Sequence, residues 1–355
     1  MTPTPTGRFF LPGPTEVHED VLAAQTRPMI GHRGAAIRTL MANIADGLAE
    51  VFQTSRPVIV STSSASGLME AAIRNGVGSG PVLALVNGAF SGRFAAIARA
   101  CGKEVVVWEV DWGSAHPVDE LARRLADRRY DAVTLSHSET STGALQELEA
   151  IASVVAEHPD TLLLVDSVTG VGGVETRPDD WGIDFVLTGS QKALALPPGI
   201  SFGVASDAMM ERAATVPDRG WYFDLVMLAE GLGKNQTPAT PAISLLYALE
   251  RQLERILDEG IEARWKRHHD MQARVLDWVD QKGLGVLADE GHRSPTVTCI
   301  VHPAPDRVVT AMAERGWVLG AGYGRVSDRT FRIGHMGDHT VEEVDALLAE
   351  LEEVI

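Results

Sequence analysis

Short apolar runs alternate with helical patterns over the middle of the chain, from Pro57 to Ala205. Successive positions of each run are apolar, so both faces of the corresponding strands are expected to be buried. Alternation of such strands with helices predicts an α/β fold, in which helices cover a mainly parallel sheet. The seven expected strands are Val58–Val60, Val82–Val86, Val105–Val110, Ala132–Leu135, Leu162–Val165, Phe185–Leu187 and Ser201–Ala205.

The remainder of the chain has a different order of elements. A long helical pattern runs from Ala242 to about Asp280 and leads away from the expected sheet. Shorter strand and helix patterns follow it, which predicts a small α+β domain. These patterns are strands at Thr296–Val301, near Trp317 and at Thr330–Ile333, a helix near Val308–Glu314, and a final helix from Val341 to Ile355.

The chain is therefore expected to consist of an N-terminal arm (1–16), a large domain (17–259) and a small C-terminal domain (260–355). Thr15 is a suitable N-cap for a short helix after the arm. Thr240, followed by Pro241, has the pattern of an N-cap with proline at the first helical position.

Composition narrows the class of protein. The 355 residues carry 31 basic and 48 acidic side chains, a net charge of −17, so neither a nucleic-acid nor a membrane partner is expected. The first residues lack the pattern of a signal peptide, and the chain has no apolar run near the length of a membrane span. Cys101 and Cys299 are its two cysteines. Both are expected to be buried thiols of a cytoplasmic protein.

Two charged residues stand at the ends of expected strands. Asp166 ends the strand at Leu162–Val165, and Lys192 follows the strand at Phe185–Leu187 after a few small and polar residues. Of the five lysines, Lys192 alone is embedded in apolar sequence, where burial can lower the pKa of an amine. Such a pair suits pyridoxal phosphate chemistry, in which a lysine forms a Schiff base and an acid pairs with the pyridine nitrogen.

Four motifs around these residues resemble class V aminotransferases, with the alanine–glyoxylate and serine–glyoxylate (serine–pyruvate) enzymes as the best fit. The similarity extends from Leu11 to Arg332 and beyond, and implies fold type I of the pyridoxal phosphate enzymes. The motifs are Leu11-Pro-Gly-Pro14, His137-Ser-Glu-Thr-Ser-Thr-Gly143, Asp166-Ser-Val-x-x-x-Gly-Gly173 and Ser190-Gln-Lys-Ala-Leu-x-x-Pro-Pro-Gly199.

The resemblance assigns further residues to the cofactor. Ser64 and its neighbours open a helix whose free N–H groups suit a phosphate, although Ala65 stands where the family usually has glycine. Phe90 is placed to stack on the cofactor ring, although an aromatic residue after a strand also suits a core. Thr237 and Thr240 are implied to reach the neighbouring subunit of a homodimer. The full set is Ser64, Ala65, Ser66, Phe90, Ser141, Asp166, Val168, Gln191, Lys192, Thr237 and Thr240.

Arg332 is the candidate for the substrate α-carboxylate, because arginine binds a carboxylate through two parallel hydrogen bonds. Gly31 and His32 are expected near the substrate. No second arginine stands out for a distal carboxylate, which favours alanine or serine as amino donor over glutamate. The resemblance implies a ping-pong transfer to a small 2-oxo acid, glyoxylate or pyruvate.

Three alternatives are weighed against transamination. A cysteine desulfurase or lyase on the same scaffold remains open, although a desulfurase needs a mobile cysteine and neither Cys101 nor Cys299 lies in an expected loop. A catalytically inactive binding scaffold would not need the Lys192 and Asp166 pair. A nicotinamide-dependent dehydrogenase is disfavoured, because no expected strand is followed by G-x-G-x-x-G.

Overall fold

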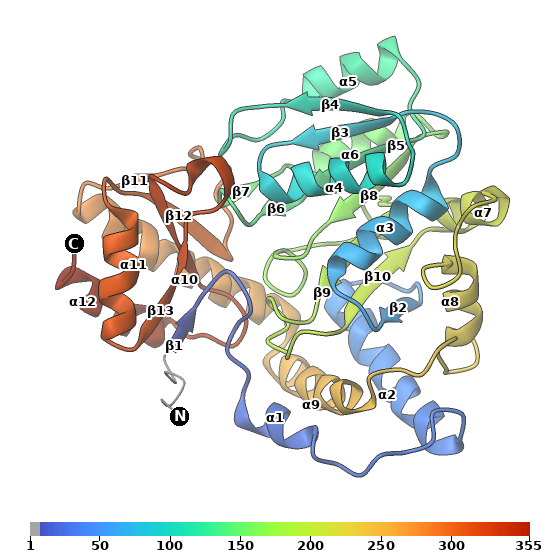
Figure 1. Cartoon of the computed structure of the whole chain (residues 1–355), viewed down its shortest axis with the longest axis horizontal. Helices are drawn as coiled ribbons and strands as arrows, with labels where there is room; N and C mark the ends of the chain where they lie inside the picture. The colour runs from blue at the N-terminus through green and yellow to red at the C-terminus, as the bar shows by residue number, and fades with distance from the viewer. Residues whose placement is uncertain (1–7) are drawn as a thin grey trace.

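The computed structural model describes residues 8–355, and the first seven residues of the expected arm lie outside this range. A seven-stranded sheet forms the centre of the larger part, in the strand order β2-β10-β9-β8-β5-β3-β4 (Figure 1). β10 is antiparallel to both of its neighbours, and the other pairs are parallel. All seven expected strands are confirmed: β2 (Val58–Ser61), β3 (Val82–Val86), β4 (Val105–Glu109), β5 (Ala132–Ser136), β8 (Leu162–Asp166), β9 (Phe185–Gly189) and β10 (Ser201–Ala205).

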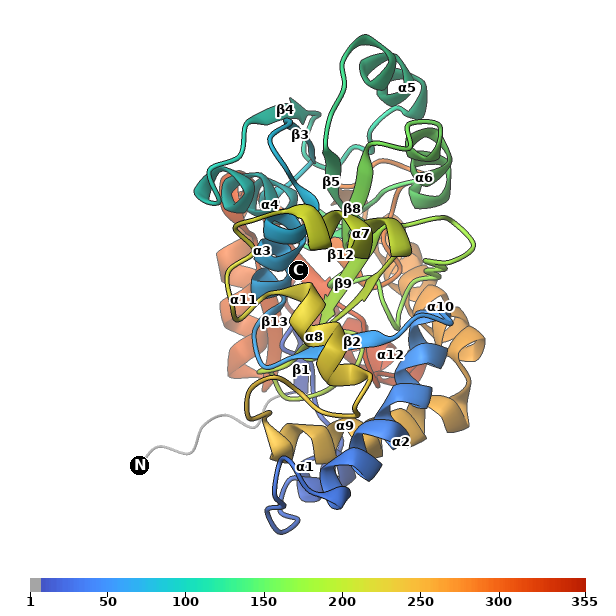
Figure 2. The same cartoon turned by 90° about the vertical axis from the view of Figure 1, so that its right-hand side faces the viewer.

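Helices cover both faces of this sheet because its strands are apolar on both sides. Val186 and Phe202 belong to the core under one group of helices, and Phe185 and Leu187 belong to the core under the other. In Figures 1 and 2 the helices α2 and α9 lie side by side. The first group is α2 (Ala35–Phe52), α5 (Val118–Asp127), α6 (Leu148–Ala156) and α9 (Ile243–Glu259); the second is α3 (Ala65–Gly76), α4 (Ala89–Ala100), α7 (Asp207–Thr215) and α8 (Leu225–Leu232).

The C-terminal part has a five-stranded sheet in the order β1-β13-β14-β12-β11, packed against three helices (Figure 1). β1 comes from the expected N-terminal arm and pairs in parallel with β13, which the sequence patterns did not indicate. Its Phe10 is fully buried in the core of this part, so the arm is tied to the C-terminal sheet. The elements are β1 (Arg8–Phe10), β11 (Gly285–Val286), β12 (Val297–Val301), β13 (Trp317–Ala321), β14 (Thr330–Gly334), α10 (Ile261–Gln281), α11 (Pro305–Glu314), α12 (Val341–Glu352) and the short 3-10 helix η1 (Gly324–Val326).

Three local predictions were wrong. The long helical pattern is two helices, α9 and α10, because Gly260 between them has a φ of 82°, outside the helical region. The short helix α1 (Glu19–Ala24) is capped by His18 rather than by Thr15. The N-cap of α9 is Ala242, two residues beyond Thr240. The Thr15 hydroxyl instead donates a hydrogen bond to the Lys192 carbonyl oxygen, a distant partner that no local pattern reveals.

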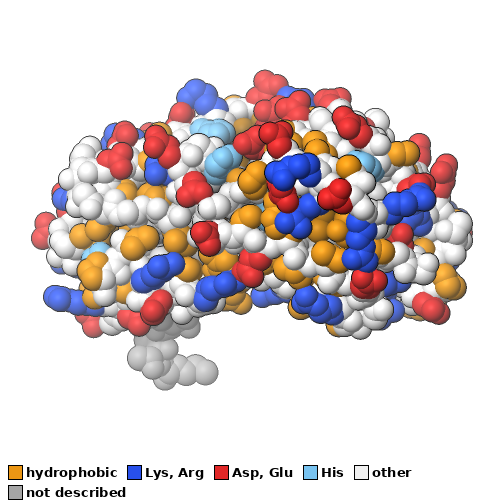
Figure 3. All heavy atoms as spheres, turned by 90° about the horizontal axis from the view of Figure 1, so that it is seen from above, with side chains coloured by type: hydrophobic (Ala, Val, Ile, Leu, Met, Phe, Trp, Pro, Cys, Tyr) orange, Lys and Arg blue, Asp and Glu red, His pale blue; other side chains and the backbone are white. Residues whose placement is uncertain are grey.

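Charged side chains of both signs are interspersed on the face shown in Figure 3, with hydrophobic side chains between them. Within residues 8–355, no helix has the length and apolar character needed to cross a membrane. The same residues contain no group of three or more His, Cys, Asp or Glu side chains placed to hold a metal ion.

Candidate active site

Lys192 lies three residues beyond β9 in a loop formed by residues 190–196, the lysine loop. Its side chain is buried, with 8% of the residue exposed, and Nζ donates a hydrogen bond to the carbonyl oxygen of Pro12. Gly13 permits this approach, because a Cβ at that position would come within 2.5 Å of Nζ. Burial lowers the pKa of Lys192 to about 8, and the positive charge of Arg332 acts in the same direction.

Asp166 is the last residue of β8 and faces the same region as Lys192. Its Oδ1 accepts a hydrogen bond of 2.9 Å from the Val168 N–H, and Oδ2 accepts one of 3.1 Å from the Ser136 hydroxyl. Burial raises the pKa of Asp166 to about 6 despite these bonds, so its negative charge is incompletely compensated. A cationic ring nitrogen would supply the missing charge, so the residues present fit pyridoxal phosphate.

The lysine loop is held from outside the large sheet. Thr15 donates its N–H to the Gln191 carbonyl at 3.1 Å and its hydroxyl to the Lys192 carbonyl at 3.1 Å. Arg264 of α10 donates to the Ala193 carbonyl at 2.7 Å. Three successive carbonyl groups of the loop are therefore fixed by the N-terminal segment and by the C-terminal part.

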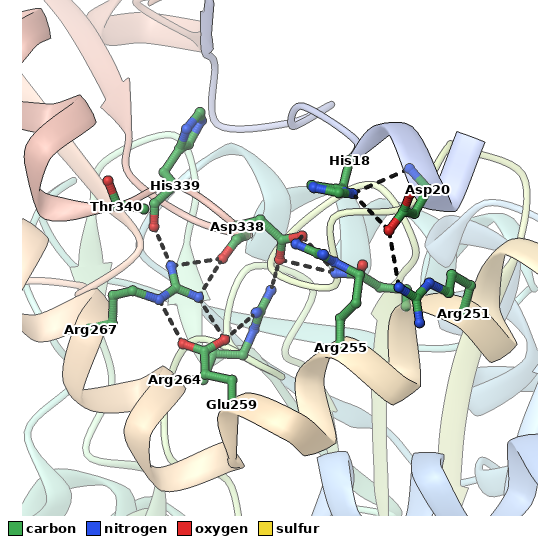
Figure 4. A network of polar contacts seen from close by, with 12 residues as sticks. His18, Asp20, Arg251, Arg255, Glu259, Arg264, Arg267, Asp338, His339 and Thr340 are labelled. Atoms are coloured by element: carbon green, nitrogen blue, oxygen red, sulfur yellow. Dashed lines mark hydrogen bonds and ion pairs between the residues drawn. The ribbon is translucent and has the colours of Figure 1, made fainter. Parts of the chain in front are cut away.

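Arg264 belongs to a network of arginines and carboxylates that Figure 4 shows at the junction of α9, α10 and the segment before α12. Arg264 forms ion pairs with Glu259 and Asp338, each at 2.8 Å. Only 1% of the residue is exposed. Arg267 donates to Glu259 at 2.6 Å, and Arg255 lies 3.5 Å from Asp338. The two carboxylates thus each face two arginines, and one of those arginines also holds the lysine loop.

The N-terminus of α3 provides a second polar region. Ser64 is its N-cap, but the Ser64 side chain makes no capping hydrogen bond, which leaves the first N–H groups of the helix free for an anion. Ala65 is 6% exposed and does not have a positive φ, so alanine needs no glycine-like backbone there. Ser66 follows in the first turn. A Cβ on Gly189 would lie near both Ala65 and the Gln191 side chain, which places Gln191 beside this terminus.

Glu139 is a buried site residue that the sequence interpretation missed. It is 0% exposed, and its carboxylate accepts hydrogen bonds from the N–H groups of Phe90 and Ser91 at the start of α4. The Ser141 hydroxyl donates to it at 2.6 Å and also accepts from the Ala89 N–H at 3.0 Å. Glu139 therefore fixes the start of α4, and its place in the motif His137–Gly143 was the only signal available.

Arg332 reaches this region from β14, where its side chain points away from the core that buries Phe331 and Ile333. Its Nε donates to the Ala321 carbonyl and its Nη1 to the Thr140 carbonyl, each at 3.0 Å. Nη2 makes no hydrogen bond to any residue within 8–355 and remains available for a carboxylate. Burial lowers the pKa of Arg332.

The remaining expected residues lie on the surface of this chain. Gly31 is exposed and His32 is half-buried in the loop before α2, and the structure gives neither a contact with Lys192. The neighbouring Arg33 donates to the carbonyl oxygens of Thr237 and Pro238 at 2.6 and 2.7 Å. Thr240 is exposed at the end of the segment that Arg33 holds.

The family model for aminotransferase class V matches residues 14–347. L-Aspartate–glyoxylate aminotransferase of Paracoccus denitrificans is 34% identical, covering 94% of this chain and 87% of that protein. Serine–glyoxylate aminotransferase of Arabidopsis thaliana is 31% identical, covering 98% and 90%. The crystal structure of an alanine–glyoxylate aminotransferase from Nostoc sp. superposes with a TM-score of 0.94 at 32% identity, covering 100% of this chain and 97% of that one.

The buried Asp166 ends one strand of the α/β sheet, and the buried Lys192 follows the adjacent parallel strand. This arrangement is typical of enzymes that use pyridoxal phosphate. The chain belongs to the aminotransferase class V family, and it is an aminotransferase.

Proposed function

We propose that the protein transfers an amino group from a small amino acid, alanine or serine, to glyoxylate or pyruvate by a ping-pong mechanism with pyridoxal 5'-phosphate. The observation that carries the proposal is the pairing of a buried Lys192 of lowered pKa with a buried Asp166 of raised pKa, in a chain of this family. Relatives named for serine, alanine and aspartate transfer to glyoxylate support the substrate class.

The bound cofactor supplies an electron sink for the bond broken at the substrate Cα. Lys192 would hold the cofactor through its amine, and the same Nζ would be the base that moves the proton at the substrate Cα. A lowered pKa suits this task, because a larger fraction of the amine is unprotonated near neutral pH. Asp166 keeps the ring nitrogen protonated, and Ser136 and Val168 orient its carboxylate through the hydrogen bonds described above.

The other assignments combine the family resemblance with the positions of the residues. The phosphate is held at the N-terminus of α3 by Ser64, Ala65 and Ser66, with Gln191 beside them. Phe90, whose ring stacks on Tyr323, would lie beside the cofactor ring, and Ser141 with Glu139 fixes the helix start that carries Phe90. Arg332 binds the substrate α-carboxylate.

A homodimer with shared sites is part of this proposal. Thr237, whose carbonyl oxygen accepts a hydrogen bond from Arg33, and Thr240 complete the phosphate site of the partner chain, and Gly31 and His32 lie near the substrate. A pocket beside this segment includes Trp221, which is 60% exposed, and a second copy would cover it. Light scattering should find a dimer, and a fully active monomer would exclude shared sites.

The raised pKa values of both cysteine thiols argue against a cysteine desulfurase activity. Cys299 is fully buried, and burial raises its pKa to about 11, so it is not a thiolate at neutral pH. Burial also raises the pKa of Cys101. Neither thiol has the thiolate character of a nucleophile.

The test is a panel of alanine, serine and other amino donors against glyoxylate and pyruvate, with the purified holoenzyme. Half-reactions should change the absorbance of the cofactor with the donor alone, and the oxo acid should restore it. A colourless protein that binds no pyridoxal phosphate, or sulfide release from cysteine without transamination, would overturn the proposal. A cytoplasmic location stays a prediction from the sequence.

A further inference from the structure

Two helices of the larger part begin at one edge of the large sheet. α3 follows β2 and α4 follows β3, and both strands run in the same direction as β8, which ends at Asp166. The N-terminus of a helix attracts anions, because its first N–H groups have no partner within the helix and carry a partial positive charge. The edge of the sheet at which Asp166 lies therefore has two helix N-termini that could hold an anionic group.

The two N-termini differ in how their N–H groups are satisfied. The N-cap side chain of α3 makes no hydrogen bond to the first turn. In α4 the first three N–H groups all have acceptors. Ala89 donates to the Ser141 hydroxyl at 3.0 Å, and Phe90 and Ser91 donate to one oxygen of the Glu139 carboxylate at 3.1 and 2.8 Å. A carboxylate of the chain itself therefore occupies the N-terminus of α4.

Glu139 is a buried charge with no partner of opposite charge. It is 0% exposed, and among the described residues its carboxylate forms hydrogen bonds but no ion pair. Only N–H and O–H groups compensate the charge, the Ser141 hydroxyl at 2.6 Å among them. Gly88, the N-cap of α4, gives the side chain room, because a Cβ there would come within 2.3 Å of Glu139 Cγ. Serine or threonine as N-cap would satisfy α4 without a buried charge, so the carboxylate indicates more than a helix cap.

Glu139 also lies between groups that belong to the candidate active site. The carbonyl oxygen of the next residue, Thr140, accepts a hydrogen bond of 3.0 Å from Arg332. Burial is the main cause of the raised pKa of Asp166, and the negative charge of Glu139 adds to it. The Glu139 carboxylate is therefore close enough to act on Asp166, and its chain neighbour holds Arg332.

We propose that Glu139 is a built-in anion, which occupies the N-terminus of α4 so that free anions bind at α3 and at Arg332 instead. The inference rests on the proposed function, in which α3 holds the cofactor phosphate and Arg332 holds the substrate carboxylate. Glu139 is a positioning residue, because it acts through Phe90 and Ser141 and not on the substrate. Its removal should open a second anion site at α4, of the size of the acetate-like group that Glu139→Ala takes away.

The first test uses the apoprotein, with acetate as the probe and sodium chloride to keep the ionic strength constant. Acetate at about ten times its dissociation constant should raise the Tm of Glu139→Ala by about 2 °C more than that of wild type, because only the variant offers the added site. Glu139→Gln is the control for size, since its amide fills the space. Glu70→Ala is the control for charge, since Glu70 forms an exposed pair with Arg74 on α3. Equal acetate responses of Glu139→Ala and wild type would overturn the inference.

The second test does not depend on the folding of the alanine variant. Glu139→Gln keeps the shape of the side chain and removes its charge, so the pKa of Asp166 should fall from its value of about 6. A carboxyl NMR titration of the apoprotein, with labelled aspartate, measures this shift, and Glu70→Gln should leave it unchanged. An Asp166 pKa that is the same in Glu139→Gln and wild type would show that Glu139 is not an anion facing the site.

The third test examines the positioning role in the holoenzyme. With alanine and glyoxylate, kcat/KM should fall about tenfold or more in Glu139→Ala, because the start of α4 is no longer held in place. Acetate should restore part of this loss in the variant, whereas in wild type it should only compete with the substrate at Arg332. Acetate that leaves the kcat/KM of the variant unchanged would contradict the positioning role. Failure of wild type to react with any donor would count against the proposed function, whereas the two apoprotein tests decide this inference without turnover.

Discussion

Arg264 donates a hydrogen bond of 2.7 Å to the carbonyl oxygen of Ala193, the residue that follows Lys192. This bond joins a helix of the C-terminal part to the loop that carries the reactive amine. Asp338 and Glu259 hold Arg264 in place from two other segments (Figure 4). The position of the lysine loop is therefore set by packing between the two parts of the chain and not by the large sheet alone.

Arg264→Met should destabilise the protein by about 3 kcal/mol or more, because it removes one of the two arginines from each of two partly buried carboxylates and leaves the Ala193 carbonyl without its donor. Urea unfolding of the apoprotein measures this loss. Arg274→Met is the control on the same helix, since the Arg274–Asp345 pair is exposed by 51% and 43% and should contribute at most about 1 kcal/mol. Similar losses of stability in the two variants would show that the buried Arg264 network contributes no more than an exposed ion pair.

Lys192→Met should stabilise the apoprotein in a pH-dependent way. The folded-state pKa is lowered to about 8 from the ordinary 10.5, so burial of the charged amine costs stability. This loss of stability is largest below pH 8, where the amine is protonated in both the folded and the unfolded chain. It disappears as the pH rises from 8 to the unfolded-state pKa of 10.5, because in this window the unfolded chain binds more protons than the folded one. The gain from Lys192→Met should be about 3 kcal/mol at pH 7 and small at pH 10.5. Urea titrations at the two pH values check this, and equal gains would mean that the amine is not desolvated.

Asp166→Asn should affect stability and activity in opposite directions. The folded-state pKa is raised to about 6, so the ionised carboxylate costs stability above pH 6, and this cost vanishes below the unfolded value of 3.8. The apoprotein of the variant should therefore be more stable than wild type at pH 7. The transamination rate should fall by several orders of magnitude, because the asparagine no longer keeps the ring nitrogen protonated. Thermal unfolding and half-reaction rates measure the two effects. A variant with near wild-type rates would remove this role from Asp166.

The sequence was sufficient for the sheet and for the buried positions of Lys192 and Asp166 beyond and at the ends of two strands, because the apolar strands and the charged residues that follow them are local patterns. It was insufficient where partners are distant. Thr15 looked like a helix cap but binds a carbonyl 177 positions away. Arg93 and Tyr323 are 230 positions apart and meet only when the two parts of the chain pack. Such contacts depend on tertiary structure, which no window of residues contains.

Arg332→Ala should lower kcat/KM for every amino acid donor by about 10- to 1,000-fold, because the α-carboxylate then lacks its partner. Arg332→Lys should recover part of the loss, since a point charge lacks the planar fork of arginine. Cofactor content should be unchanged, and this is measured by absorbance after release of the cofactor. Normal kcat/KM with alanine and serine would mean that another residue holds the carboxylate. Two other arginines, Arg33 and Arg325, are already engaged, the first with backbone carbonyls and the second with Glu109.

The most direct measurement is reduction of the purified holoenzyme with borohydride, followed by peptide mapping of the lysine that retains the cofactor. We predict a yellow protein whose reduced adduct lies on Lys192, the buried lysine at the end of β9. Lys103 donates to the Val77 carbonyl, Lys266 pairs with Asp270, Lys282 pairs with Glu352, and Lys234 is exposed. An adduct on Lys103, Lys234, Lys266 or Lys282, or a protein that retains no cofactor, would contradict the assignment of Lys192 as the reactive amine.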